Sequence, residues 1–277
     1  MQLQSVSVRL TAPHSFTSGI EGPACDVQGN VYAVNYARRH TIGKVTPEGN
    51  GSLFLELPEG ATGNAIRFNR SGHMYIADYS GHRILKVDMM TKQISIFAEE
   101  PRMNQPNDLA VTRNETWFAS DPNWKQGNGR LWRIGPSGNC ELLETGMGTT
   151  NGIEVSYDER TLYVNETLQR RIWKYDLSEK KEIGNKRLFY EFADYGLDGM
   201  RCDMAGNVYV TRHGKGTVAV LSPEGVLVGE VALNGKLCTN VTFGGIDGRT
   251  CYVTVADTGA IESFRTDIAG RCWALWK

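Results

Sequence analysis

The sequence predicts an all-β fold, a six-bladed β-propeller with four-stranded antiparallel blades. Three observations support this prediction. Short runs of alternating apolar and polar residues occur along all 277 residues, whereas helical periodicity is nearly absent. One strand-like phrase recurs six times. The recurring unit is about 43 residues long, which is the period of a propeller blade, and each blade must pack on its neighbours to bury both faces.

The recurring phrase begins after a turn, alternates aromatic and β-branched residues, and ends on a polar residue, as β-strands do. Its six copies are GNVYAVN (29–35), GHMYIAD (72–78), ETWFASD (115–121), TLYVNE (161–166), GNVYVTR (206–212) and TCYVTVAD (250–257). A second strand-like run follows each copy, and a third follows in most units, for example RILKVD and QISIFAEE after the second copy.

A further strand precedes each copy, which completes four strands per unit. We call these six segments the leading phrases: EGPAC (21–25), NAIRF (64–68), NDLAV (107–111), NGIEV (151–155), DGMRC (198–202) and TNVTF (239–243). Their first residues are separated by 41 to 47 positions. We therefore expect one propeller domain over residues 1–277, with the leading phrases innermost, beside the central tunnel.

The sequence leaves the closure of the ring open between two segments. SVSVRL (5–10) precedes the first leading phrase much as SLFLEL precedes the second, so it could supply the outer strand of the last blade. RCWALW (271–276) follows the last unit at a spacing that also fits an outer strand. We expect the N-terminal strand in the last blade, with the C-terminal strand beside it or in its place.

Composition narrows the classes of function. Hydrophobic residues make up 40% of the chain, charged residues 22%, and the net charge is −1, so no basic excess is available for nucleic acid. The longest apolar runs are strand-sized, and the first ten residues do not resemble a signal peptide. The six cysteines form no C-x-x-C pair. We expect reduced thiols in a cytoplasmic protein that does not contact a membrane; the sequence carries no sign of its oligomeric state.

Polar residues begin the leading phrases, and their positions converge on one mouth of the predicted tunnel. They are Glu21, Asn64, Asn107, Asn151, Asp198 and Thr239. The third and fifth residues of each phrase are mostly apolar, which places them in the core. The polar residues could simply cap strands and bind tunnel waters. Two carboxylates facing one mouth, however, resist joint ionisation unless a cation lies between them.

Carboxylate and amide oxygens are the ligands of hard divalent cations such as Ca²⁺, Mg²⁺ and Mn²⁺. No His or Cys begins a leading phrase, which argues against a closed structural zinc site. The same face of the ring carries the residues that end the recurring phrases, and SDPNWKQGNG (120–129) is its longest loop. These rim residues are Tyr36, Arg38, Arg39, Tyr79, His82, Asn123, Trp124, Glu166, Arg170, Arg212, His213, Lys215 and Asp257. The basic ones could hold an acidic or polyhydroxylated substrate, or form only a solvated rim.

The segments EGP, PNDLAV, NGI, LDGM and TNVTFGG, in this order and at blade spacing, resemble the SMP-30/gluconolactonase/luciferin-regenerating-enzyme family. The bacterial sugar-lactonase and Drp35-like branch is the most similar one. The resemblance covers essentially the whole chain and implies a six-bladed propeller with one divalent metal at the tunnel mouth. It implies that Glu21, Asn151 and Asp198 are metal ligands and that Asp198 is the general base. Calcium is the first choice of metal, with Mg²⁺, Mn²⁺, Zn²⁺ or Fe²⁺ as alternatives.

The same resemblance implies a substrate site around the metal. Asn107 is expected as a substrate contact or a fourth ligand, together with Gln105, Asn123, Tyr36 and His213 as substrate-binding residues. Animal members carry Arg-x-Asn-Asp where this chain has Gln105-Pro106-Asn107-Asp108. The absence of that arginine indicates a different sugar specificity.

The resulting hypothesis is hydrolysis of a small sugar-acid lactone, in carbohydrate metabolism. The metal would polarise the lactone carbonyl, and Asp198 would take a proton from the attacking water or orient a water activated by the metal. Phosphotriester hydrolysis on the same architecture is an alternative, and a panel of lactones and organophosphates would separate the two. A non-catalytic binding propeller and a metal-free strictosidine-synthase-like propeller are disfavoured by the carboxylates at the tunnel mouth.

Overall fold

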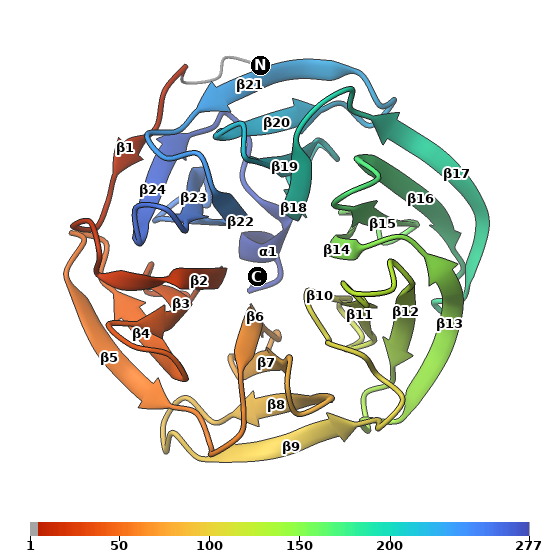
Figure 1. The fold of residues 1–277 in the computed structure, drawn as a ribbon, viewed down its shortest axis with the longest axis horizontal. Helices are drawn as coiled ribbons and strands as arrows, with labels where there is room; N and C mark the ends of the chain where they lie inside the picture. The colour runs from red at the N-terminus through yellow and green to blue at the C-terminus, as the bar shows by residue number, and fades with distance from the viewer. Residues whose placement is uncertain (1–4, 277) are drawn as a thin grey trace.

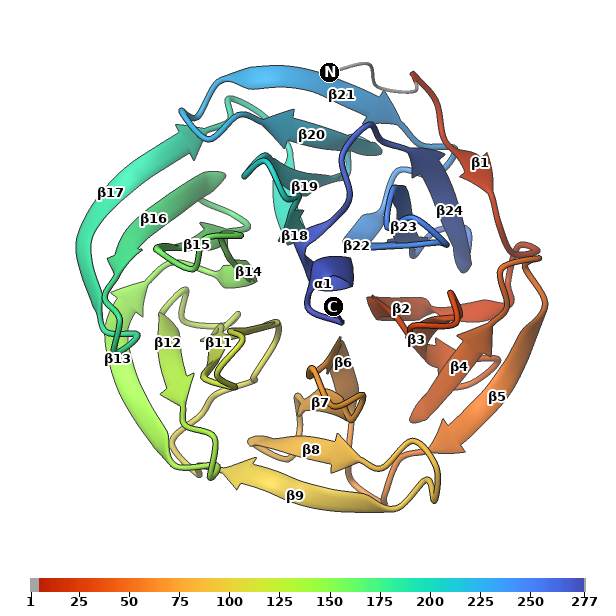
Figure 2. The same ribbon diagram turned by 180° about the vertical axis from the view of Figure 1, so that it is seen from behind.

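The computed structural model describes residues 5–276 and confirms the predicted fold: six antiparallel four-stranded sheets form a closed ring (Figures 1 and 2). Blades are numbered here from the N-terminus and their strands from the tunnel outward. Blades 1 to 3 comprise β2 (Phe16–Cys25), β3 (Val31–Tyr36), β4 (Thr41–Val45) and β5 (Gly51–Glu56); β6 (Gly63–Phe68), β7 (Met74–Asp78), β8 (Arg83–Val87) and β9 (Ile94–Glu99); and β10 (Leu109–Val111), β11 (Trp117–Asp121), β12 (Gly129–Ile134) and β13 (Cys140–Met147).

Blades 4 to 6 repeat the arrangement on the other half of the ring. They comprise β14 (Thr150–Val155), β15 (Thr161–Glu166), β16 (Arg171–Leu177) and β17 (Ile183–Glu191); β18 (Gly196–Cys202), β19 (Val208–His213), β20 (Thr217–Leu221) and β21 (Leu227–Ala232); and β22 (Cys238–Gly244), β23 (Thr250–Val255), β24 (Ala260–Arg265) and β1 (Val8–Arg9).

The hydrophobic core lies between neighbouring blades because each sheet is apolar on both faces. The second strands contain the recurring aromatic phrase, and every residue of β7 is buried. Aromatic rings join one blade to the next: Tyr75 of blade 2 lies 4.1 Å from Trp117 of blade 3, measured between ring centroids. Tyr209 of blade 5 meets Phe243 of blade 6 edge to face at 4.9 Å. The recurring aromatic residue therefore holds adjacent blades together.

The N-terminal strand closes the ring, as expected. β1 pairs antiparallel with β24, with Val8 opposite Ser263 and Arg9 opposite Glu262. The hydroxyl of Ser7 also donates a hydrogen bond to the buried carboxylate of Glu262. The last blade therefore combines three strands from the end of the chain with one from its beginning, so the closure resists opening from either end.

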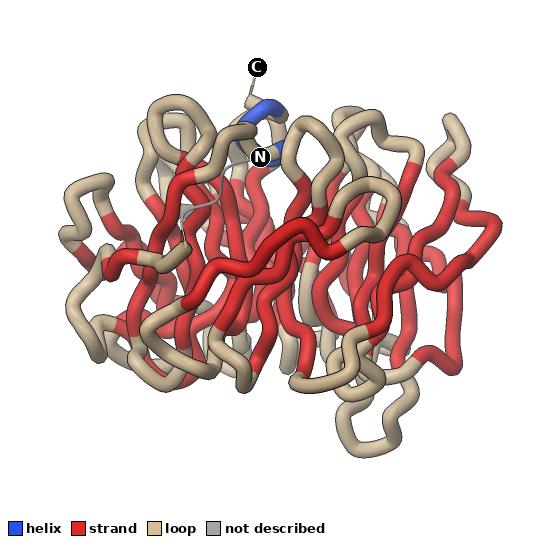
Figure 3. The backbone as a smooth tube through the Cα atoms, turned by 90° about the horizontal axis from the view of Figure 1, so that it is seen from above, coloured by secondary structure: helices blue, strands red, loops and turns tan. Residues whose placement is uncertain are grey.

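The expectation of a C-terminal outer strand is wrong. Residues Arg271–Ala274 form a short helix, α1, which lies at one face of the ring over the tunnel (Figures 1 and 3). The buried guanidinium of Arg271 donates to the backbone oxygens of Val111, at 2.8 Å, and Ser156, at 3.1 Å, and contacts two carboxylates, Glu154 at 3.3 Å and Glu159 at 3.1 Å. An outer strand would leave those two carboxylates without this partner.

The structure agrees with the expectation of reduced cysteines and of apolar runs no longer than a strand. All six cysteines are free, and four of them are buried, so they pack as small core residues. Among residues 5–276, no helix has the length and apolar character needed to cross a bilayer.

Replacing Arg271 with alanine should lower the free energy of unfolding by about 3–5 kcal/mol, because Glu154 then stays buried without its nearer guanidinium partner. The matched control is Arg187→Ala, which breaks an exposed pair with Asp176 and should cost less than about 1 kcal/mol. Urea denaturation followed by tryptophan fluorescence measures both. Equal losses for the two variants would contradict the assigned role of Arg271.

Candidate functional site

A cleft of about 640 Å³ lies at the tunnel mouth opposite α1. It is lined by Gly19, Glu21, Asn35, Arg39, His40, Thr62, Gly63, Asn64, Tyr79, Asn107, Trp124, Asn151, Thr167, Asp198 and His213. Its floor is formed by the starts of the leading phrases, and its walls by the loops between second and third strands. Five of the six polar residues predicted to converge on the tunnel mouth therefore line one cavity.

Two carboxylates, Glu21 of blade 1 and Asp198 of blade 5, lie in the floor of this cleft. Burial raises the pKa of Glu21 from its ordinary value of 4.5 to about 8, and the charge of Asp108 adds to the rise. Burial and the charge of Glu21 raise the pKa of Asp198 well above its usual range. The two groups therefore resist ionising together, and a cation between them would remove that resistance.

The amide oxygens of Asn107 and Asn151 complete a donor set for such a cation. Both residues are buried, and neither Oδ1 atom has a hydrogen-bond partner in the described structure. Buried polar atoms without partners are rare in folded proteins, and a bound ion or water in the cleft would satisfy these two oxygens. The side-chain nitrogen of Asn151 donates to Thr167 at 3.1 Å, which fixes the amide. Two carboxylate and two amide oxygens fit a hard divalent cation.

The donor set does not fit a zinc site of the Cys or His type. Within residues 5–276, no three His, Cys, Asp or Glu side chains cluster as metal ligands. Only two of the four oxygen donors here carry charge, and their combined charge balances that of one divalent cation. Four protein donors would be fewer than the six to eight ligands that calcium takes or the six that magnesium takes.

Irregular pairing of the inner strands aims these side chains at the tunnel axis. In a regular strand, the first residue of a leading phrase would point to the same side as its third and fifth residues, into the core. In blade 3, the regular ladder starts only at Leu109, after Asn107. In the other five blades the register shifts close to the polar residue, between Glu21 and Ala24, Gly63 and Ile66, Thr150 and Ile153, Leu197 and Met200, and Cys238 and Val241. Such bulges re-aim side chains.

A glycine follows each of three predicted ligands because the inner strand of the next blade packs against it. A β-carbon at Gly22, Gly152 or Gly199 would collide with a neighbour, respectively the backbone at Asn64, the backbone around Asp198, or the side chain of Asn240. Gly22 also has a φ of +60°, which favours glycine. The Glu-Gly, Asn-Gly and Asp-Gly pairs thus bring adjacent blades close enough for their side chains to meet.

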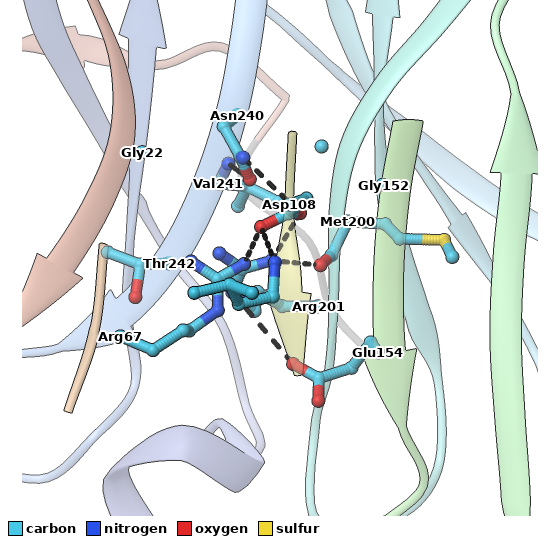
Figure 4. A network of polar contacts seen from close by, with 12 residues as sticks. Gly22, Arg67, Asp108, Gly152, Glu154, Met200, Arg201, Asn240, Val241 and Thr242 are labelled. Carbon is cyan, nitrogen blue, oxygen red and sulfur yellow. Dashed lines mark hydrogen bonds and ion pairs between the residues drawn. The ribbon is translucent and has the colours of Figure 1, made fainter. Parts of the chain in front are cut away.

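Beneath the floor lies a charged layer that the sequence analysis missed (Figure 4). Asp108 forms ion pairs with Arg67 and with Arg201, whose Nη1 lies 3.3 Å from Asp108 Oδ2. Asn240 donates from Nδ2 to Glu21 Oε1 at 3.3 Å and to Asp108 Oδ2 at 3.4 Å. The layer therefore links the floor of the cleft to the interior of the tunnel.

The missed layer has a simple signal in the sequence. The fourth residue of every leading phrase lines a small tunnel cavity of about 30 Å³ below the site, and these residues are Ala24, Arg67, Ala110, Glu154, Arg201 and Thr242. They alternate with the apolar third and fifth residues. Charges at three of these six positions could have been found from the alternation that identified the core.

The structure brings some of the predicted substrate residues into the cleft. Asn107 and His213 line it. The Nδ1 atom of His213 lies 3.1 Å from the backbone oxygen of Cys238 and 3.6 Å from Asp198 Oδ2. His213 is thus positioned beside the predicted base.

Three other predicted substrate residues do not line the cleft. The ring of Tyr36 packs against Phe16, with centroids 5.2 Å apart. Gln105 donates its backbone N–H to Asp121 at 2.6 Å, and Asn123 bonds to Gln126 within its own loop. The walls are formed by Arg39, Tyr79 and Trp124, which belong to the predicted rim, and by Asn35, His40 and Thr167, which the sequence analysis did not name. Of the six residues that begin leading phrases, Thr239 alone does not line the cleft, because its hydroxyl donates to the backbone oxygen of Ile20 at 2.9 Å.

The raised pKa of Glu21 gives a stability prediction for the chelator-treated protein. Between pH 4.5 and about 8, the folded state keeps a proton on Glu21 that the unfolded state releases, so rising pH favours unfolding. The free energy of unfolding of wild type, relative to the Glu21→Gln variant, should therefore decrease across this window. Urea titrations of both proteins at several pH values measure it. A pH-independent difference would contradict the buried, uncompensated state of this carboxyl.

Comparison with known proteins places the chain in a family. A gluconolactonase from Zymomonas mobilis is 27% identical over 272 residues, which cover 85% of this chain and 76% of the relative. A 6-deoxy-6-sulfogluconolactonase from Pseudomonas putida is 27% identical over 219 residues, 76% of this chain and 74% of the relative. The solved structure of a calcium-binding protein, regucalcin, from Agrobacterium tumefaciens has a TM-score of 0.82 at 20% identity and covers 96% of this chain and 95% of its own. The family described as the SMP-30/Gluconolactonase/LRE-like region matches residues 18–257. The chain therefore belongs to the SMP-30/gluconolactonase/LRE-like family, as its leading phrases predicted.

Proposed function

We propose that this protein is a metal-dependent hydrolase that opens a sugar-acid lactone. The observation that carries the proposal is the floor of the cleft, where the buried carboxylate of Glu21 and the partly exposed carboxylate of Asp198 lie with two buried amide oxygens that lack partners. This arrangement suits a cation that is held from one side and open to a small molecule on the other. The relatives named gluconolactonase and 6-deoxy-6-sulfogluconolactonase support a hexonolactone as substrate class.

Glu21, Asn151 and Asp198 would hold the cation, with Asn107 as a fourth ligand or a substrate contact. Calcium is our first choice because all four donors are oxygens, and a solved neighbour is described as calcium-binding. When bound, the cation would supply a Lewis acid that polarises the lactone carbonyl as negative charge grows on its oxygen.

In the proposed reaction, Asp198 accepts a proton from the attacking water. The water oxygen forms a bond to the carbonyl carbon, and the bond between that carbon and the ring oxygen breaks. Asp198 returns the proton to the ring oxygen, which leaves as a hydroxyl group. The product is the open hydroxy acid. His213 lies beside this carboxylate, with Nδ1 at 3.6 Å from Asp198 Oδ2.

The walls of the cleft suit a polyhydroxylated ring. Tyr79 and Trp124, from the neighbouring blades 2 and 3, present aromatic surface, and Asn35 and Thr167 present polar groups to the cleft. Aromatic faces pack against the C–H surfaces of a ring, while amide and hydroxyl groups bond its hydroxyls.

The Asp198→Asn variant should keep the propeller folded and lower kcat for lactone hydrolysis by at least about 100-fold, because it removes the proton acceptor. Asp176→Asn, whose side chain on β16 is 45% exposed and lies outside the cleft, is the matched control and should retain full activity. Chelation should abolish wild-type turnover, and addition of calcium should restore it.

The assay is a panel of hexonolactones, with acid release followed after subtraction of spontaneous hydrolysis. Circular dichroism checks that both variants are folded. A folded Asp198→Asn variant with wild-type turnover would exclude Asp198 as the base. A chelated enzyme with an unchanged rate would exclude the metal-dependent mechanism.

A further inference from the structure

The wall of the cleft carries one guanidinium group, that of Arg39, in the loop between β3 and β4. Among the described residues, its side chain has neither an ion-pair nor a hydrogen-bond partner, although it belongs to the lining of the cleft. The other charged residues of the lining are Glu21 and Asp198. Once those two carboxylates are compensated by a divalent cation, Arg39 leaves the cleft with a net positive charge.

Three other basic residues of the rim already form ion pairs with carboxylates of this chain. Arg38, next in the chain, pairs with the exposed carboxylate of Glu56. Arg212 is buried and bonds Asp194 at 2.7 Å, and Lys215 bonds Glu230 at 2.6 Å. None of the three lines the cleft. Arg170, the remaining arginine of the predicted rim, does not line the cleft either. Arg39 is therefore the one arginine of that rim which lines the cleft.

The turn that presents Arg39 is well fixed although the residue itself is exposed. The side chain of Asn35 accepts from the backbone N–H of His40 at 3.1 Å and donates to the backbone oxygen of Gly19 at 2.7 Å. The hydroxyl of Thr41 lies 2.7 Å from the backbone oxygen of Tyr36 and 2.8 Å from that of Arg38. Hydrogen bonds on both sides of Arg39 therefore hold its backbone at the wall of the cleft.

Arg39 lies farther from the tunnel axis than the metal ligands. Glu21 is on β2, the innermost strand of blade 1, whereas Arg39 follows β3, the next strand outward (Figure 1). A lactone whose carbonyl reaches the floor at the axis would extend its far end towards this wall. A volume of about 640 Å³ accommodates a sugar ring together with a substituent.

We propose that Arg39 is a specificity residue that selects lactones carrying a second, anionic group at the end remote from the lactone carbonyl. This inference rests on the proposed function. The shared chemistry of the group is a carboxylate, phosphate or sulfonate, since a guanidinium presents paired N–H donors that match two oxygens of such an anion. A neutral lactone would leave Arg39 hydrated and gain nothing from it.

The test compares matched substrates on the metal-loaded enzyme: a neutral hexonolactone, the same lactone with a terminal phosphate or sulfonate, and an aldaric acid lactone with a terminal carboxylate. Wild type should show a kcat/KM about 10- to 100-fold higher for the preferred anionic lactone than for the neutral one. Arg39→Gln should lower kcat/KM for the anionic lactone at least about 10-fold more than for the neutral lactone, which removes the preference. Arg39→Lys should keep part of it, and the control Arg38→Gln all of it.

Comparison of the phosphate, sulfonate and carboxylate lactones shows which terminal anionic group the enzyme prefers. Equal losses on neutral and anionic lactones in Arg39→Gln would overturn the inference, because they would show general ring binding or a structural role. A wild-type enzyme that favours the neutral lactone would overturn it as well, and either result leaves the proposed function standing. Failure of wild type to hydrolyse any lactone would instead overturn the proposed function, and this inference with it.

Discussion

The repulsion between the carboxylates of Glu21 and Asp198 is the constraint around which the site is organised. They come from blades 1 and 5, and the ring brings both to the floor of one cleft where burial raises their pKa values. Folding around two such groups is costly unless protons or a cation compensate them. The unpartnered amide oxygens of Asn107 and Asn151 would add ligands without adding charge, so a single divalent cation would satisfy the whole floor.

The tunnel beneath continues the same pattern of charge. Asp108 would add a third negative charge near the floor, but Arg67 and Arg201 bind it from below. Glu154 lies 3.8 Å from Arg201 and 3.3 Å from Arg271 of the helix that covers the far mouth. Acidic and basic side chains thus alternate along the axis. We infer that the charges inside the tunnel compensate one another. An external cation is then needed only at the mouth opposite α1, where Glu21 and Asp198 lie.

The repeat made most of the fold predictable from the sequence. The apolar third and fifth residues of the leading phrases identify the inner strands, and the aromatic phrase identifies the second strands. The C-terminal segment escaped prediction because RCWALW has the composition of a strand, whereas its place is decided by long-range contacts of Arg271. Helix α1 is only four residues long, too short for periodicity to reveal.

The candidate site, like the fold, could be predicted only in part from the sequence. The positions of Glu21, Asn151 and Asp198 follow from the blade repeat, although their orientation depends on bulges that the sequence does not show. The walls were harder to predict, because loop residues have no repeat to fix them. Tyr36 directly follows its phrase as Tyr79 does, yet the ring of Tyr36 packs on Phe16, while Tyr79 lines the cleft.

Calorimetric titration of the chelator-treated protein with calcium tests the central claim most directly. The floor of the cleft predicts one ion per chain, with affinity weakened at least about 10-fold in Asn151→Ala, which removes a neutral donor and leaves both carboxylates in place. Asn185→Ala, at an exposed position, should bind as wild type does. Absence of binding by calcium and by magnesium, manganese, zinc and iron(II), or equal affinity in wild type and Asn151→Ala, would contradict a metal centre at this tunnel mouth.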